Sequence, residues 1–162
     1  MTSFAKSLTD AVTAVLVADA DEFTESFTPT TKLVPRWTLE DLATLRVSVC
    51  PGAFARVGAA RGGHETGHDI ASNSVYVLVQ KRIGTDEGAV DEDDVDALLL
   101  LVEQIIGRFR KRAVTATSKR CVCTARETIG AEEAANVGFD RDILANHHVF
   151  NGVIKLDFAV LS

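Results

Sequence analysis

Hydrophobic residues recur at steps of three and four along two stretches of the chain, which is the spacing of one helix face. The first stretch is residues 3–18, where Thr2 or Ser3 can act as the N-cap; its apolar positions are Phe4, Leu8, Ala11, Val12, Val15 and Leu16. The second stretch is residues 92–113, with a stripe of Val95, Leu98, Leu99, Val102, Ile105, Ile106 and Phe109. The pattern predicts two amphipathic helices, each with one face to bury.

Two stretches between these helices alternate apolar and polar residues, which is typical of strands. In the first, Val47 and Val49 alternate with polar neighbours, and Pro51 is expected to end the strand. The second is residues 70–83, where one face carries Val75, Val77 and Val79 and the other carries Tyr76 and Leu78. Both stretches are therefore expected to lie in one sheet.

Three further strands are expected on weaker or more distant patterns. Phe23 and Phe27 would share one face of a short strand before Pro29. Residues 119–126 and 148–161 also alternate, and the last stretch has on one face Phe150, Ile154, Leu156, Phe158 and Val160. Three stretches lack a clear period: a connector with a short helical turn near residues 39–44, a glycine-rich loop at 52–69, and a loop at 130–146 that has room for a short helix.

The order of these elements is helix, three strands, helix, two strands. Helices are too few for a βαβ repeat, so the sequence predicts an α+β fold, a mostly antiparallel sheet with two main helices on one face. Residues 1–162 are expected to form a single domain, because no linker or internal repeat divides the chain.

Charge is unevenly distributed around the second predicted helix. The net charge of −6 gives no global basic field for nucleic acid or anionic lipid. An acidic block precedes and opens the helix, with Asp86, Glu87, Asp91, Glu92, Asp93, Asp94 and Asp96, and a basic block follows it, with Arg108, Arg110, Lys111, Arg112, Lys119 and Arg120. The helix dipole favours this arrangement by about 0.3–1 kcal/mol per well-placed charge, which is a purely local explanation.

The cysteines and the N-terminus predict a soluble protein that folds in a reducing cytoplasm. Three cysteines, an odd number, argue against a secreted disulfide framework. The first residues, MTSFAKSLTDAV, lack the basic and apolar regions of a signal peptide. The longest apolar run, residues 97–102, is too short to span a bilayer.

Residues 64–68 read His-Glu-Thr-Gly-His and match the H-E-x-x-H motif of zinc peptidases. That motif needs a helix, which places both imidazoles on one side with the glutamate beside the bound water. Each interior glycine costs a helix about 1 kcal/mol, and three lie in or near the motif, Gly62, Gly63 and Gly67. No third ligand follows at a recognised spacing. The sequence therefore favours a loop, and leaves a small zinc metallopeptidase using His64, Glu65 and His68 as an alternative.

Other residues with metal-binding chemistry lack companions at regular spacing. Cys121 and Cys123 are expected to be small buried residues of a sheet, and His147 and His148 are expected at the surface. No phosphate-binding loop, nucleophile elbow or dinucleotide motif is present. The expectation is a protein without cofactor, metal or catalytic residues, and not an enzyme.

Several short words along the chain resemble the small tail-terminator and neck proteins of long-tailed bacteriophages. They are FAKSLTDAVTAVL, LVPRWTLEDLATLRVSVCP, SVYVLVQKRI, DDVDALLLLVEQIIGRF and FNGVIKLDFAV. The resemblance implies a structural protein of the virion neck, made in the host cytoplasm, without a membrane or cofactor. It implies a ring, typically six-fold, that caps the tail tube and meets the head connector. A head–tail joining or tail-completion protein of the neck would resemble this sequence equally.

The resemblance also suggests roles for two segments. DNA would pass through the lumen of the ring without specific binding, and acidic residues suit a lumen because they repel phosphate. The candidate lumen-facing acids are Asp86, Glu87 and Asp91. The loop at 52–69 would contact a neighbouring subunit or the tail tube, with Arg56, Arg61, His64, Glu65 and His68 as its candidate assembly residues. The acidic and basic blocks would pair between subunits, and such a ring would dissociate at high salt.

Overall fold

The computed structural model describes residues 2–56, 71–84, 90–129 and 138–161, and over these the chain has an α+β fold, as the sequence predicts. Its elements in chain order are α1 (Phe4–Ala18), η1 (Ala20–Glu22), β1 (Pro29–Thr31), η2 (Asp41–Ala43), β2 (Arg46–Arg56), β3 (Ala71–Arg82), α2 (Glu92–Arg108), β4 (Ala113–Ala116), β5 (Lys119–Ile129), α3 (Arg141–His147) and β6 (Val149–Leu161).

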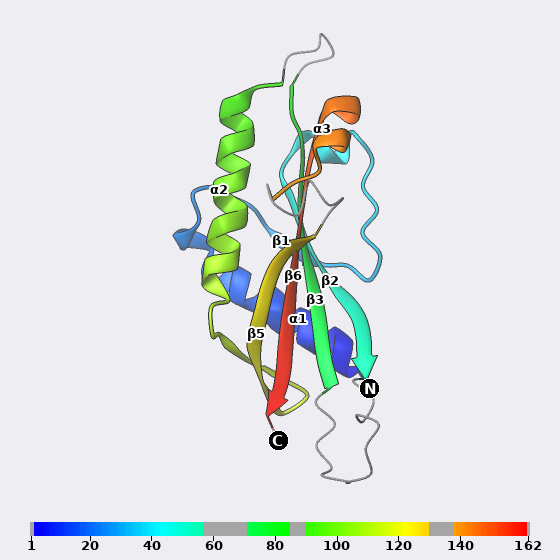
Figure 1. Cartoon of the computed structure of the whole chain (residues 1–162), viewed down its shortest axis with the longest axis vertical. Coiled ribbons are helices and arrows are strands. Elements are labelled where there is room, and N and C mark those ends of the chain that lie inside the picture. Colours follow the sequence, from blue (N-terminus) through cyan, green and yellow to red (C-terminus); the bar gives the residue numbers. More distant parts are fainter. Residues whose placement is uncertain (1, 57–70, 85–89, 130–137, 162) are drawn as a thin grey trace, which may run out of the picture.

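The described strands form one six-stranded sheet in the order β1-β2-β3-β6-β5-β4 (Figure 1). β1 runs parallel to β2, and every other neighbouring pair is antiparallel. The centre of the sheet joins strands that are distant in sequence, since Val77 of β3 lies opposite Ile154 of β6. The mostly antiparallel sheet is therefore confirmed.

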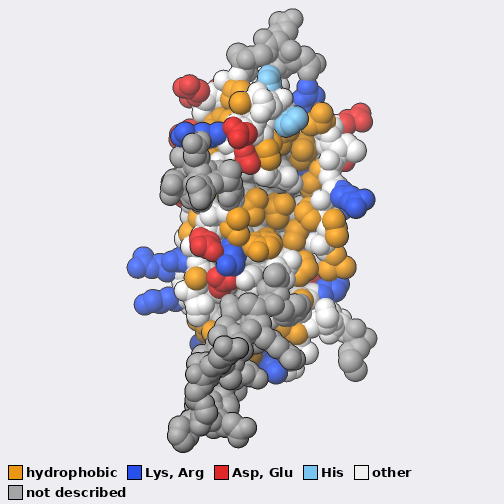
Figure 2. All heavy atoms as spheres, turned by 45° about the vertical axis from the view of Figure 1, so that its right-hand side comes forward, with side chains coloured by type: hydrophobic (Ala, Val, Ile, Leu, Met, Phe, Trp, Pro, Cys, Tyr) orange, Lys and Arg blue, Asp and Glu red, His pale blue; other side chains and the backbone are white. Residues whose placement is uncertain are grey.

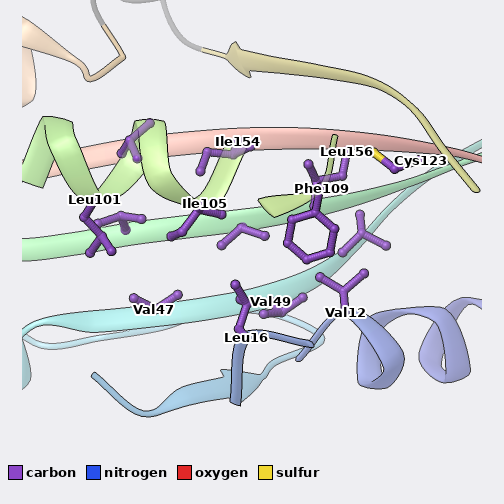
Figure 3. Packing of buried hydrophobic residues seen from close by; sticks show 14 of the residues in the cluster. Val12, Leu16, Val47, Val49, Leu101, Ile105, Phe109, Cys123, Ile154 and Leu156 are labelled. Atoms are coloured by element: carbon purple, nitrogen blue, oxygen red, sulfur yellow. The ribbon is translucent and has the colours of Figure 1, made fainter. Parts of the chain in front are cut away.

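The hydrophobic core lies on one side of this sheet. Leu16 of α1 and Ile105 of α2 are fully buried in the same cluster as inward-pointing strand residues such as Ile154 (Figure 3). The strands contribute alternate positions to this cluster, because successive side chains of a strand point to opposite faces. Both main helices thus cover one face of the sheet, and the other face is built from the remaining alternate positions.

Pro51 does not end the second strand. β2 continues to Arg56, and its register with β3 shifts between Pro51 and Phe54. β1 covers only the part of β2 from Val47 to Val49, so Pro51 lies where one side of β2 has no described strand beside it. A missing N–H is tolerated at such an edge and irregularity. The expected loop at 52–69 is therefore wrong for its first five residues.

Two other local expectations are corrected by backbone conformation and packing. Phe23 and Phe27 do not lie on a strand; their ring centroids are 5.3 Å apart, and the strand begins only at Pro29. The second helix, which was expected to extend to residue 113, ends at Arg108. The strands β4 and β5 then form a hairpin that turns at Thr117 and Ser118, whose φ angles are +48° and +62°. Two successive residues with positive φ form the turn that suits a two-residue hairpin, although neither is a glycine.

The last helix changes the place of the two neighbouring histidines. His147 is the final residue of α3, and His148 follows it with a φ of +52° as the left-handed cap of that helix. The strand β6 begins one residue later, at Val149. α3 begins at the N-cap Asp140, whose carboxylate accepts hydrogen bonds from the backbone N–H groups of Asp142 and Ile143.

Candidate assembly surface

The face of the sheet that points away from α1 and α2 carries a row of apolar side chains. The register places Leu78 of β3 opposite Val153 of β6, and Val153 opposite Ile129 of β5. Leu78 and Val153 are partly exposed and Ile129 is exposed, so these three side chains form what we name the apolar strip. Figure 2 shows hydrophobic side chains gathered in the middle of one side of the molecule, with charged side chains around them.

Polar side chains border the apolar strip along the strands. On one side, Lys155 Nζ lies 3.1 Å from a carboxylate oxygen of Glu127 and 3.5 Å from one of Asp157. The hydrogen bond that Lys155 donates to Glu127 raises the pKa of Lys155, so its ammonium stays charged. On the other side, the Gln80 amide donates to the Asn151 side-chain oxygen at 2.9 Å. The two networks hold the borders of the strip in defined positions.

The connector, residues 32–45, covers the β2 end of the same face. Trp37 Nε1 donates a hydrogen bond of 3.0 Å to the Oγ of Ser48, a buried hydroxyl of β2. Lys32 Nζ lies 4.5 Å and the Arg46 guanidinium carbon 5.0 Å from the centroid of the Trp37 ring, within cation–π range. The connector is therefore anchored on the sheet and does not extend freely into solvent.

Several large apolar side chains of the connector nevertheless point into solvent. Leu33 and Val34 are each 65% exposed and Leu39 is 55% exposed. A turn stabilised by Asp41 follows them: its carboxylate accepts hydrogen bonds from the backbone N–H and the hydroxyl of Thr38, at 3.0 and 2.9 Å. Those two bonds lower the pKa of Asp41. The connector thus presents exposed apolar side chains from an ordered backbone.

The acidic block lies at the N-terminal end of α2, where the sequence predicts that it meets the helix dipole. Asp91 is the N-cap and accepts a hydrogen bond from the backbone N–H of Asp93, and the first turn contains Glu92, Asp93 and Asp94. Asp91 itself is exposed. The other candidate lumen-facing acids, Asp86 and Glu87, lie outside the described residues.

The basic end of α2 is partly neutralised within the chain. Arg108 pairs with Glu22 at 2.7 Å, and Arg112 pairs with Asp19 at 3.3 Å. The bases Arg110, Lys111, Lys119 and Arg120 are exposed, and in the part of the chain that the structure describes none of them forms an ion pair. Pairing of the basic block with a neighbouring subunit remains a prediction, and only these four residues are available for it.

Of the five candidate assembly residues in the loop at 52–69, the structure describes only Arg56. Arg56 is the last residue of β2 and lies opposite Ala71 of β3. Arg61, His64, Glu65 and His68 lie outside the described residues. Over residues 2–56, 71–84, 90–129 and 138–161, no three histidine, cysteine or acidic side chains are grouped so that they would hold a metal ion.

The three cysteines are buried and have no partner sulfur among the described residues. Cys121 and Cys123 point into the core, as expected for small residues of a sheet. Burial raises the pKa of Cys50 and of Cys123 to about 11, so both thiols remain protonated at neutral pH. Neither is an activated nucleophile.

Comparison with known proteins adds no relative: no family model and no curated protein matches the chain. None of the described helices has the length and apolar character required to cross a bilayer.

The apolar strip and the exposed connector residues were not among the candidate residues taken from the sequence. One signal was present, because the alternation in β3 places Leu78 on the face opposite its three valines.

Proposed function

We propose that the protein is a structural subunit that acts by assembling with copies of itself, and that it forms the ring of a phage tail terminator. The observation that carries this proposal is the apolar strip on the sheet face that the helices leave open. Contiguous exposed apolar surface on a soluble domain is a frequent mark of a protein–protein contact. The exposed apolar side chains of the described residues support binding between surfaces.

The direction of α2 supports the proposed passage of DNA through such a ring. This helix runs along the long axis of the molecule, with its acidic first turn near one end (Figure 1). If that end faces the axis of a ring, each subunit adds acids to the lumen, and like charges keep DNA phosphates from adhering. Asp91, Glu92 and Asp93 are exposed and available for this role.

The mass of the protein in solution tests self-assembly directly. The chain has a mass of 17.4 kDa, and light scattering together with electron microscopy should show a closed ring with a mass that is an integral multiple of it. Purified ring added to polymerising tail tube protein should cap the tube and stop its growth. A chain that stays monomeric, alone and with tail tube protein, contradicts the proposal.

The position in the neck and the alternative chemistry need separate measurements. Binding to the head connector without binding to the tail tube would identify a head–tail joining protein instead.

Metal analysis of the purified protein tests the alternative hypothesis of a zinc peptidase that uses His64, Glu65 and His68. We expect no stoichiometric zinc, and the same metal content in His64→Ala; zinc that is lost in that variant would favour the peptidase.

A further inference from the structure

The connector and the apolar strip lie on the same face of the sheet, because Trp37 donates a hydrogen bond to Ser48, which lies opposite Leu78 of the strip. Trp37 makes this intramolecular contact through the buried hydroxyl of Ser48, and η2, which contains the buried Leu42, packs against β3. The strip begins at the next strand, with Leu78 of β3. This face of the sheet therefore already accepts the connector at Ser48 and on β3, while Leu78 and Val153 stay partly exposed and Ile129 stays exposed.

We propose that the apolar strip of one subunit receives residues 32–36 of a second copy of the chain, in a head-to-tail contact. This inference rests on the proposed function and specifies which surfaces meet in the ring. Each subunit would offer residues 32–36 to one neighbour and its strip to the other. A contact between two different surfaces closes into a ring when the rotation between copies allows it.

The polarity of the two surfaces matches. Residues 32–36 read Lys-Leu-Val-Pro-Arg, so two exposed apolar side chains lie between two bases with no acid among them. Arg36 is exposed and forms no ion pair with any described residue. The strip is apolar, and at its border the two acids Glu127 and Asp157 share the single base Lys155, so this border keeps one net negative charge. Leu33 and Val34 would cover the strip while Arg36 approaches Glu127.

The connector backbone is already held in one conformation, and this favours the proposed contact. Residues that must become ordered on binding lose conformational entropy, and a segment already held in place loses less. The segment 32–36 is held in place by the hydrogen bond of Lys32 N–H to the Val49 carbonyl at 2.9 Å and by Trp37 on Ser48. Pro35 further restricts the backbone between the apolar pair and Arg36.

Two substitutions separate the two surfaces. Ile129→Glu damages the strip and leaves the connector intact, whereas Val34→Glu damages the connector and leaves the strip intact. Val17→Glu on α1 and Leu100→Glu on α2 are matched controls, because both also replace an exposed apolar residue, away from the two surfaces. All four variants should keep the far-ultraviolet circular dichroism and the urea midpoint of the wild type.

Light scattering of each variant and of the 1:1 mixture tests the contact. We expect the two controls to assemble as the wild type does, and Ile129→Glu and Val34→Glu to be monomers when alone. Their mixture should give a dimer of two chains and nothing larger, because only one intact strip and one intact connector can meet in each pair.

The possible outcomes distinguish this inference from the proposed function. If the wild type forms rings and both interface variants also do so, the inference is wrong and the proposed function stands. If Val34→Glu pairs with itself, the contact is strip to strip and the inference is wrong. If the wild type forms open chains with the expected mixing behaviour, the inference stands and the closed ring fails. A monomeric wild type contradicts both.

Discussion

The indole of Trp37 and the hydroxyl of Ser48 form a hydrogen bond that links the connector to the second face of the sheet, at 3.0 Å. Ser48 is fully buried, so its hydroxyl has no access to water and depends on this partner. Trp37 is the only tryptophan of the chain, and its fluorescence therefore reports on the connector alone.

Replacement of Trp37 should lower stability through this bond. We expect Trp37→Phe to reduce the free energy of unfolding by about 1 kcal/mol or more, since a buried hydroxyl loses its donor and cannot recruit water. Urea unfolding followed by circular dichroism measures the loss. Ser48→Ala in the Trp37→Phe background should recover part of it, because the unsatisfied hydroxyl is then removed; an equal or greater loss in the double variant contradicts the explanation.

Acid should loosen the connector at a pH below the ordinary range of an aspartate. The hydrogen bonds from Thr38 lower the pKa of Asp41 from its ordinary value of 3.8. A depressed pKa in the folded state contributes stability that is present above pH 3.8 and is lost as the pH falls through the folded value. Trp37 fluorescence should report this change as a transition with its midpoint below 3.8, and Asp41→Asn should abolish it. A midpoint at or above 3.8 would show that the turn does not stabilise the carboxylate.

The thiols should be unreactive in the folded protein. Cys50, Cys121 and Cys123 are buried, and burial raises the pKa of each. An aromatic disulfide reagent at pH 8 should therefore label none of them within minutes, and all three at once in concentrated urea. Rapid labelling of one thiol in the folded protein would show that its strand opens locally.

The two acids beside the basic end of α2 should differ in their contribution to stability. The Asp19 side chain is 17% exposed and lies near both Arg108 and Arg112, at 3.9 and 3.3 Å, whereas Glu22 is 64% exposed. Asp19→Asn should cost about 1–2 kcal/mol of unfolding free energy, because it leaves the partly buried guanidinium of Arg112 without a counter-charge and leaves Arg108 with Glu22 alone. Glu22→Gln should cost less than about 0.5 kcal/mol, as expected for an exposed pair. Urea unfolding of both variants gives the comparison, and equal losses would contradict it.

The periodic elements of the fold were predictable from local sequence. The apolar stripe from Leu98 to Ile105 lies on the buried face of α2, and the alternating valines from Val75 to Val79 lie on the buried face of β3. The spacing of apolar residues predicts such elements because it follows which face is buried. The grouping of two helices on one side of an antiparallel sheet followed from their number and order. These expectations were confirmed.

The elements that escaped prediction depend on contacts between distant residues or on unusual backbone conformations. Pro51 was predicted to end its strand. It is tolerated inside β2 because β1 pairs with that strand only as far as Val49. The hairpin at Thr117 and Ser118 lacks the glycine or asparagine that usually marks such a turn.

Some features of the candidate site could also be predicted from the local sequence, and others could not. The position of the acidic block at the N-terminal end of α2 is a local feature and was foreseen, whereas the N-cap role of Asp91 was not. The apolar strip exists only because β3, β6 and β5 are neighbours, and no local pattern reports which strands lie side by side. The exposure of Leu33 and Val34 likewise depends on how Trp37 anchors the connector.

The pairing of β3 with β6 at the centre of the sheet sets an order for biosynthesis. Asn73 lies opposite Phe158, so the central pair cannot form until nearly the whole chain described here has left the ribosome. Before that point the nascent chain carries β2 and β3 with one of their edges unpaired and their valines exposed, a state that favours aggregation. Chaperone dependence during synthesis, and loss of soluble product when translation stops before β6, would be the cellular signs of this topology.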